Sequence, residues 1–115
     1  MSTKKNAKSF LESLIKGPPT FGKMLYSLRT ADAVSQTELA NKAKVSKGLI
    51  CDIEKDRRDA TIELATTLAK ILDYPPESFI SILLEEQIRR ANLNFKVTLE
   101  KAAWFELAVG NFIKI

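Results

Sequence analysis

The sequence predicts an all-α protein with a single domain. Glycine and proline are sparse, with 4 of each among 115 residues, and residues that favour helices are common. Apolar residues also recur at helical spacing, as when Phe21, Met24 and Leu28 stand at i, i+3 and i+7. A chain of this length can bury one modest core but is too short for two independent domains.

Composition narrows the function classes. The hydrophobic share is 45%, the charged share is 28%, and the net charge of +4 mildly favours an anionic partner. With Cys51 as its one cysteine and no histidine, one copy cannot build an internal disulfide, a zinc site, or Ser-His or Cys-His catalysis. No apolar run approaches the roughly 20 residues that span a bilayer, and no secretory signal is recognisable. We therefore expect a cytoplasmic protein that is not an enzyme and has no metal, cofactor or membrane partner.

Residues 1–19 precede the first strong helical stripe. Three lysines stand in residues 1–8, which we interpret either as a solvated tail or as a basic arm that lies along nucleic-acid phosphates. Residues 9–15 predict a short helix that ends before Gly17 and Pro18. This helix either caps the domain or contributes to a dimer.

Three helices are predicted next. The first begins after Thr20, an N-cap candidate, and two short helices follow over about residues 36–43 and 46–54. Ser35 and Glu38 have the spacing of a capping box, and Ser46 can cap the second short helix. The residues expected to face inward are Leu39, Ala40, Ala43, Val45, Ile50 and Ile53. The helix over 46–54 therefore has a narrow apolar seam and an exposed, partly basic first turn.

Two further helices are expected after a charged loop at 55–59. Thr61 can cap the first, which ends near Tyr74 and Pro75, and the second covers about residues 77–91. The inward residues predicted for the first are Ile62, Ala65, Leu68, Ala69 and Leu72. The second has an apolar face of Phe79, Ile80, Leu83, Leu84 and Ile88. This face packs on the core, forms a dimer surface, or does both.

The tail from residue 92 to residue 115 is too apolar to remain free in water. Phe95, Val97 and Leu99 alternate with polar residues, which predicts a short strand. An otherwise helical chain offers a pairing edge for that strand mainly from a symmetry mate. A helix is expected over about 102–109, ended by Gly110. The tail is therefore buried against the core, a second subunit or a partner protein.

The stretch from Val34 to Arg58 resembles the helix-turn-helix of the Cro/lambda-repressor-like (XRE) DNA-binding domains. The matching residues are Ser35, Gln36, Glu38, Leu39, Ala40, Val45, Ser46, Ile50, Ile53 and Glu54. The resemblance extends over about residues 21–74, and it implies a five-helix domain with an added N-terminal helix and a C-terminal extension. Three residues depart from the pattern: Lys44 replaces the usual turn glycine, and Asp56 and Ala60 replace a glycine and a proline. Lys44 must then adopt a left-handed conformation, or the turn is built differently.

The resemblance implies ten DNA-contact candidates. They are Gln36, Thr37, Ser46, Lys47, Gly48, Leu49, Asp52, Lys55, Arg57 and Arg58. The helix over 46–54 corresponds to the recognition helix of the family. In it, Lys47 can donate to guanine O6 and N7 or to a phosphate, and Gly48 lets the backbone approach the groove. Leu49 can touch a thymine methyl group or merely pack. Asp52 can accept from cytosine N4 or repel phosphate at wrong registers. Cys51 is interpreted as an inert small residue.

The other candidates flank the recognition helix. Gln36 can bond a phosphate and brace the recognition helix, or it can simply cap the start of its own helix. Arg57 and Arg58 are the best phosphate contacts, because guanidinium matches phosphate geometry, although the charged loop also fits a solvated connection. Glu54 is expected to bond within the domain.

We therefore predict a sequence-specific repressor that binds an inverted-repeat operator in double-stranded DNA as a homodimer. Residues 1–19 would form the basic tail and short helix, residues 20–74 the DNA-binding domain, and residues 75–115 a dimerisation or partner segment. The alternative is an antitoxin-like DNA-binding protein whose residues 92–115 bind a toxin.

Overall fold

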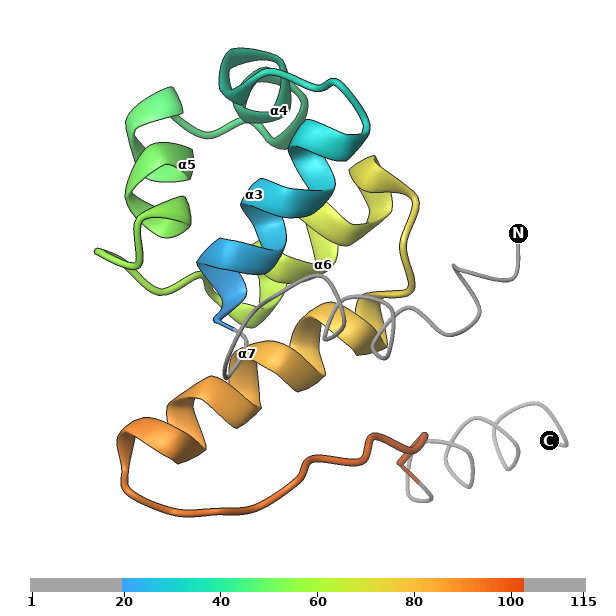
Figure 1. Cartoon of the computed structure of the whole chain (residues 1–115). Coiled ribbons are helices and arrows are strands. Elements are labelled where there is room, and N and C mark those ends of the chain that lie inside the picture. The colour runs from blue at the N-terminus through green and yellow to red at the C-terminus, as the bar shows by residue number, and fades with distance from the viewer. Residues whose placement is uncertain (1–19, 103–115) are drawn as a thin grey trace, which may run out of the picture.

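The computed structural model describes residues 20–102, and over them the chain is all-helical (Figure 1). The helices are α3 (Phe21–Ala31), α4 (Gln36–Ala43), α5 (Lys47–Glu54), α6 (Ile62–Leu72) and α7 (Pro76–Arg90). The predicted all-α class is confirmed. The basic tail, the short helix over 9–15 and the helix over 102–109 were predicted for stretches that lie outside the described residues, apart from residue 102. None of the helices within 20–102 combines the length and apolarity that crossing a bilayer requires.

Hydroxyl side chains begin four of these helices. The side chains of Thr20, Ser35, Ser46 and Thr61 each accept a hydrogen bond from the backbone N–H three residues later, at 3.0–3.1 Å. Each bond satisfies one of the N–H groups that a helix start leaves unpaired. The capping box is only half formed, because the carboxylate of Glu38 lies 3.3 Å from Lys42. α7 begins instead with Pro76, whose missing N–H costs nothing at that position.

Left-handed residues end α4 and α6. Lys44 has φ 60° and ψ 41°. It therefore adopts the left-handed conformation that the family's usual turn glycine would adopt at this position. Asp73 does the same after α6, with φ 62°. Asp56, in the loop after α5, has φ 60°. Aspartate tolerates this region better than most residues, whereas lysine adopts it at a cost.

One apolar core joins all five helices of residues 20–102. α3 packs against α5 and α7, α4 against α5 and α6, and α6 against α7. The fully buried large side chains are Met24, Leu25, Leu28, Leu39, Ile50, Ile53, Leu68, Phe79, Ile82 and Leu83. The prediction that Ile62 faces inward is wrong, because its side chain is 51% exposed. Ile62 is the first residue of α6, and helical side chains lean toward the N-terminus, so this one projects past the end of the core.

α7 contributes to that core through its first turns. Phe79 lies edge-on against Phe21, with ring centroids 5.8 Å apart, and stacks on Tyr74 at 6.3 Å. Phe79 and Leu83 are fully buried, so this part of the apolar face of α7 is core, whereas Ile80, Leu84 and Ile88 are half-buried.

After α7 the chain turns and runs back beneath that helix as an extended stretch, coloured orange to red in Figure 1. We call residues 93–102 the C-terminal segment. In the one chain that the structure describes, this segment has no regular secondary structure, so the strand predicted at Phe95–Leu99, which was expected to pair mainly with a symmetry mate, stays a prediction. The physical reason for the irregular conformation is the lack of an edge to pair with, since the rest of the described chain is helical.

Candidate nucleic-acid interface

A glycine sets how closely α5 approaches α3. A Cβ atom added at Gly22 would lie 2.2 Å from the carbonyl oxygen of Ile53 and 2.9 Å from that of Glu54. The last turn of α5 therefore rests directly on the backbone of α3, which a larger residue would prevent. This contact is not predictable from the sequence, because a glycine in a helix does not indicate which backbone will pack against it.

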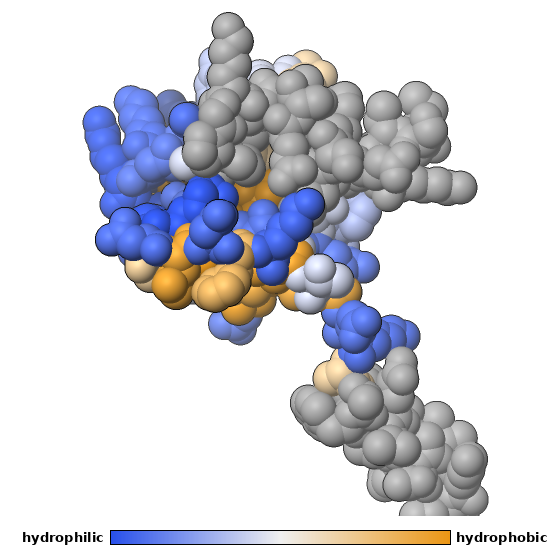
Figure 2. Space-filling model, turned by 60° about the horizontal axis from the view of Figure 1, so that its bottom comes forward, coloured by the Kyte–Doolittle hydropathy of each residue, from blue (hydrophilic) through white to orange (hydrophobic). Residues whose placement is uncertain are grey.

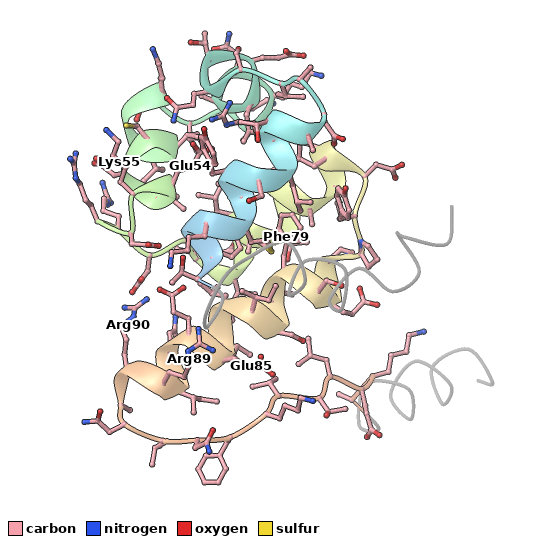
Figure 3. The ribbon with its side chains drawn as sticks, in the orientation of Figure 1. Glu54, Lys55, Phe79, Glu85, Arg89 and Arg90 are labelled. Atoms are coloured by element: carbon pink, nitrogen blue, oxygen red, sulfur yellow. The ribbon has the colours of Figure 1, made fainter. Side chains whose placement is uncertain are left out.

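A buried ion pair holds the same end of α5. Arg29 Nε and Nη2 donate to the two oxygens of Glu54 at 2.6 and 3.0 Å, a bidentate pair whose side chains are 10% and 3% exposed. Gln36 Nε2 donates to Glu54 Oε1 at 2.9 Å, and Arg29 Nη1 donates to the carbonyl of Val34 at 2.8 Å. The hydrogen bond to Glu54 raises the pKa of Arg29 above its ordinary value. Figure 3 shows Glu54 on the side of α5 that faces α3.

This network joins α3, α4 and α5 through one carboxylate. It agrees with the expectation that Glu54 bonds within the domain. It also gives Gln36 the bracing role that was one of its predicted alternatives, with its amide nitrogen committed to Glu54. The amide oxygen of Gln36 remains at the start of α4, where the side chain is half-buried.

The first turn of α5 faces away from the core. Lys47 and Gly48 are exposed, while Leu49 and Asp52 are half-buried, and Leu49 packs against the edge of the core. The hydroxyl of Ser46 accepts from the N–H of Leu49, so this side chain is occupied in capping. A Cβ atom at Gly48 would meet only the Ser46 hydroxyl, at 3.9 Å. Nothing within the described chain therefore requires glycine at this position.

The loop after α5 carries the exposed cations. Lys55, Arg57 and Arg58 are all exposed, and Figure 3 shows Lys55 on the outer side of α5. The Arg57 guanidinium lies 3.7 Å from Asp52, a loose pair in which both side chains are more than one third exposed. The N–H of Arg57 donates to the Asp52 carbonyl at 2.8 Å, which continues the path of α5 into the loop.

The far end of the loop is fixed to α7. Arg90 donates to both oxygens of Asp59, at 2.6 and 3.1 Å, and to Glu86 at 2.9 Å. These bonds hold the pKa of Asp59 below its ordinary value. The other oxygen of Glu86 accepts from the N–H of Phe21 at 2.8 Å, at the start of α3. Sequence reasoning missed this cluster, whose only local signal is the i, i+4 spacing of Glu86 and Arg90.

The exposed members of the predicted set stand at three places along the chain. Thr37 is exposed on α4 beside Gln36, the front turn of α5 follows it, and the cations at 55–58 continue along the chain. The neighbouring helices hold α5 from behind, through Gly22 and Glu54. Among residues 20–102, no three His, Cys, Asp or Glu side chains are grouped as a metal site would need.

Comparison with known proteins agrees with this geometry. Residues 25–79 match the helix-turn-helix family model HTH_3. No curated protein matches the chain in sequence. Among solved structures, the restriction-modification controller protein C.AhdI from Aeromonas hydrophila is 30% identical over 51% of this chain and 89% of its own, with a TM-score of 0.49.

Two further structures share the fold. One is the antitoxin HigA of Pseudomonas aeruginosa, solved with the higBA promoter, which is 22% identical over 65% of this chain and 83% of its own, with a TM-score of 0.60. The other is the clp gene regulator ClgR of Corynebacterium glutamicum, 22% identical over 66% and 85%, with a TM-score of 0.52. On the matched residues, the motif and the five-helix arrangement, this chain belongs to the Cro/lambda-repressor-like (XRE) helix-turn-helix family of DNA-binding regulators.

Proposed function

We propose that this protein is a cytoplasmic, sequence-specific repressor that binds an inverted-repeat operator as a homodimer. The observation that carries the proposal is the exposure of Lys47 and Gly48 in the front turn of α5, on a helix fixed from behind by Gly22 and Glu54. A helix presented in this way fits the major groove of duplex DNA. Two copies would place their α5 helices in successive grooves, about 34 Å apart.

Each part of the candidate interface has its own role in this proposal. Lys47 donates to guanine, and Leu49 contacts a thymine methyl group, so both contribute sequence preference. Gly48 carries no side chain because the groove approaches the backbone there, which accounts for a glycine that the fold does not require. Lys55, Arg57 and Arg58 lie along phosphates and supply affinity that falls with salt.

Alanine variants separate these roles. Lys47→Ala should lose about 1–3 kcal/mol of preference for the operator over other duplexes. Arg57→Ala and Arg58→Ala should weaken binding to all duplexes alike and lower the salt slope by about one each. Selection of bound sites from random DNA would supply the operator, and titration of each variant on operator and random duplexes would supply the comparison. Equal losses on both duplexes for Lys47→Ala would contradict its base contact. No preference among duplexes at low salt for the native protein would overturn the whole proposal.

The second candidate is an antitoxin-like regulator that neutralises a toxin through its C-terminal extension. The exposed apolar side chains of the C-terminal segment favour a protein contact there. A capture experiment with a neighbouring gene product, repeated after removal of residues 92–115, would distinguish this function from plain repression. Binding that survives the removal would reject this candidate.

A further inference from the structure

The C-terminal segment concentrates exposed apolar side chains. Leu93 is 49% exposed, Phe95 65% and Leu99 37%, and these are three of the five exposed large hydrophobic residues within residues 20–102. Figure 2 turns the underside of Figure 1 toward the viewer and shows hydrophobic residues gathered on this face, bordered by hydrophilic ones. Exposed apolar residues that cluster in this way mark a contact surface.

A buried carboxylate fixes the segment in place. Glu85 on α7 is 6% exposed, and its Oε2 accepts from the backbone N–H of Val97 at 2.8 Å. Figure 3 shows Glu85 on the side of α7 that faces the segment. The N–H of Leu93 also points back to α7, donating to the carbonyl of Ile88 at 3.1 Å. The bond from Leu93 closes the C-terminal turn of α7, after the left-handed Asn92, and the bond from Val97 directs an N–H group within the segment toward α7.

The even-numbered residues present the opposite edge. In extended backbone, successive N–H groups point to opposite sides, so those of Asn94, Lys96 and Thr98 point away from α7. No hydrogen bond within residues 20–102 uses the backbone groups of these three residues. The segment thus has the features of an unpaired strand edge: a fixed position, free backbone groups and apolar side chains on one face.

We propose that the C-terminal segment pairs in antiparallel fashion with the same segment of a second copy, about a two-fold axis at Thr98. This register sets Lys96 opposite Glu100 of the second copy and, by symmetry, Glu100 opposite its Lys96. It also sets Val97 opposite Leu99 twice, on the apolar face. A second copy is the occupant that supplies both the missing strand and the complementary charges. The inference rests on the homodimer of the proposed function, and it names the residues that build it.

Charge reversal tests the register. Sedimentation equilibrium of the full chain, without DNA, should show native dimers, and Lys96→Glu or Glu100→Lys should each raise the dimer dissociation constant about tenfold or more. Each single change places like charges opposite each other at two symmetric positions. An equimolar mixture of the two single variants should regain native affinity, because every facing pair is then Glu with Lys. The double variant K96E/E100K should also regain it.

Two more variants complete the design. Phe95→Ser should weaken the dimer by removing apolar area, and Lys70→Glu, a charge reversal on the exposed side of α6, should leave it unchanged. Circular dichroism would establish that each variant is folded. A native protein that is monomeric at micromolar concentration would overturn the inference, even if the segment then proved to bind a different protein. Single reversals that dimerise like the native chain, or a mixture with no recovery, would overturn it as well.

The outcome is independent of DNA binding. If the substitutions in the C-terminal segment leave the dimer unchanged and the protein still selects an inverted repeat, this interface is rejected and the proposed function is kept. If the dimer depends on the C-terminal segment but the protein shows no preference among duplexes, the interface is kept and the proposed function is rejected.

Discussion

Glu54→Ala is the most informative test of how the recognition helix is held. The change removes the acceptors of Arg29 Nε and Nη2, at 2.6 and 3.0 Å, and of Gln36 Nε2, at 2.9 Å. The guanidinium, 10% exposed, keeps only its bond to the Val34 carbonyl among those described above. Breaking one side of a buried ion pair costs about 3–5 kcal/mol. The free energy of unfolding of a small domain is about 5–15 kcal/mol, so this loss would be a large share of the total stability.

Urea unfolding followed by circular dichroism would measure the loss. Glu63→Ala is the matched control, because Glu63 is an exposed glutamate in the first turn of α6, and its removal should change stability by at most about 0.5 kcal/mol. Replacing both partners, Arg29→Met with Glu54→Leu, should be less damaging than Glu54→Ala, since no buried charge is left alone. A loss below about 1 kcal/mol for Glu54→Ala, or a double variant no better than the single one, would refute this reasoning.

Three further predictions concern backbone and surface charge. Gly22→Ala should cost about 1–3 kcal/mol because its Cβ would overlap the α5 backbone, whereas the control Gly48→Ala should gain about 0.5–1 kcal/mol in thermal or urea unfolding while weakening DNA binding. Lys44→Gly should stabilise the fold by up to about 1 kcal/mol, since glycine adopts φ 60° without strain; a loss on unfolding would contradict this. Asp59→Asn should cost about 0.2–1 kcal/mol near neutral pH, as for other exposed ion pairs. Because Arg90 lowers the pKa of Asp59 in the folded state, this difference should be present above about pH 4 and vanish as the pH falls through the lowered value; a pH-independent difference would refute it.

The sequence predicted the elements whose signals are local. The N-caps at Ser35, Ser46 and Thr61 require only a hydroxyl before a helical stripe, and all three are confirmed. The left-handed Lys44, one of two alternatives for the turn, followed from its position, where the family usually has a turn glycine. The exposed first turn of α5 followed from its narrow apolar seam.

What the sequence could not predict depends on distant partners. The close approach at Gly22 involves backbone more than 30 residues away, and the pairing of Asp59 with Arg90 joins residues 31 apart. Ile62 has the sequence spacing of the inward-facing residues of α6, but no element of residues 20–102 covers its side chain. The alternation at Phe95–Leu99 is a strand pattern that finds no pairing edge within residues 20–102, because strand formation needs a second edge whereas helix formation does not.

The support of α5 has a consequence for how binding preference can change. Gly22 and Glu54 act at the C-terminal end of the helix, whereas Lys47 and Gly48 stand at the other end and contribute little to the core. If the proposed base contacts hold, substitutions at Lys47 and Gly48 would alter target choice with little effect on the packing of the core. A change of operator preference would then require no compensating change in the interior of the domain.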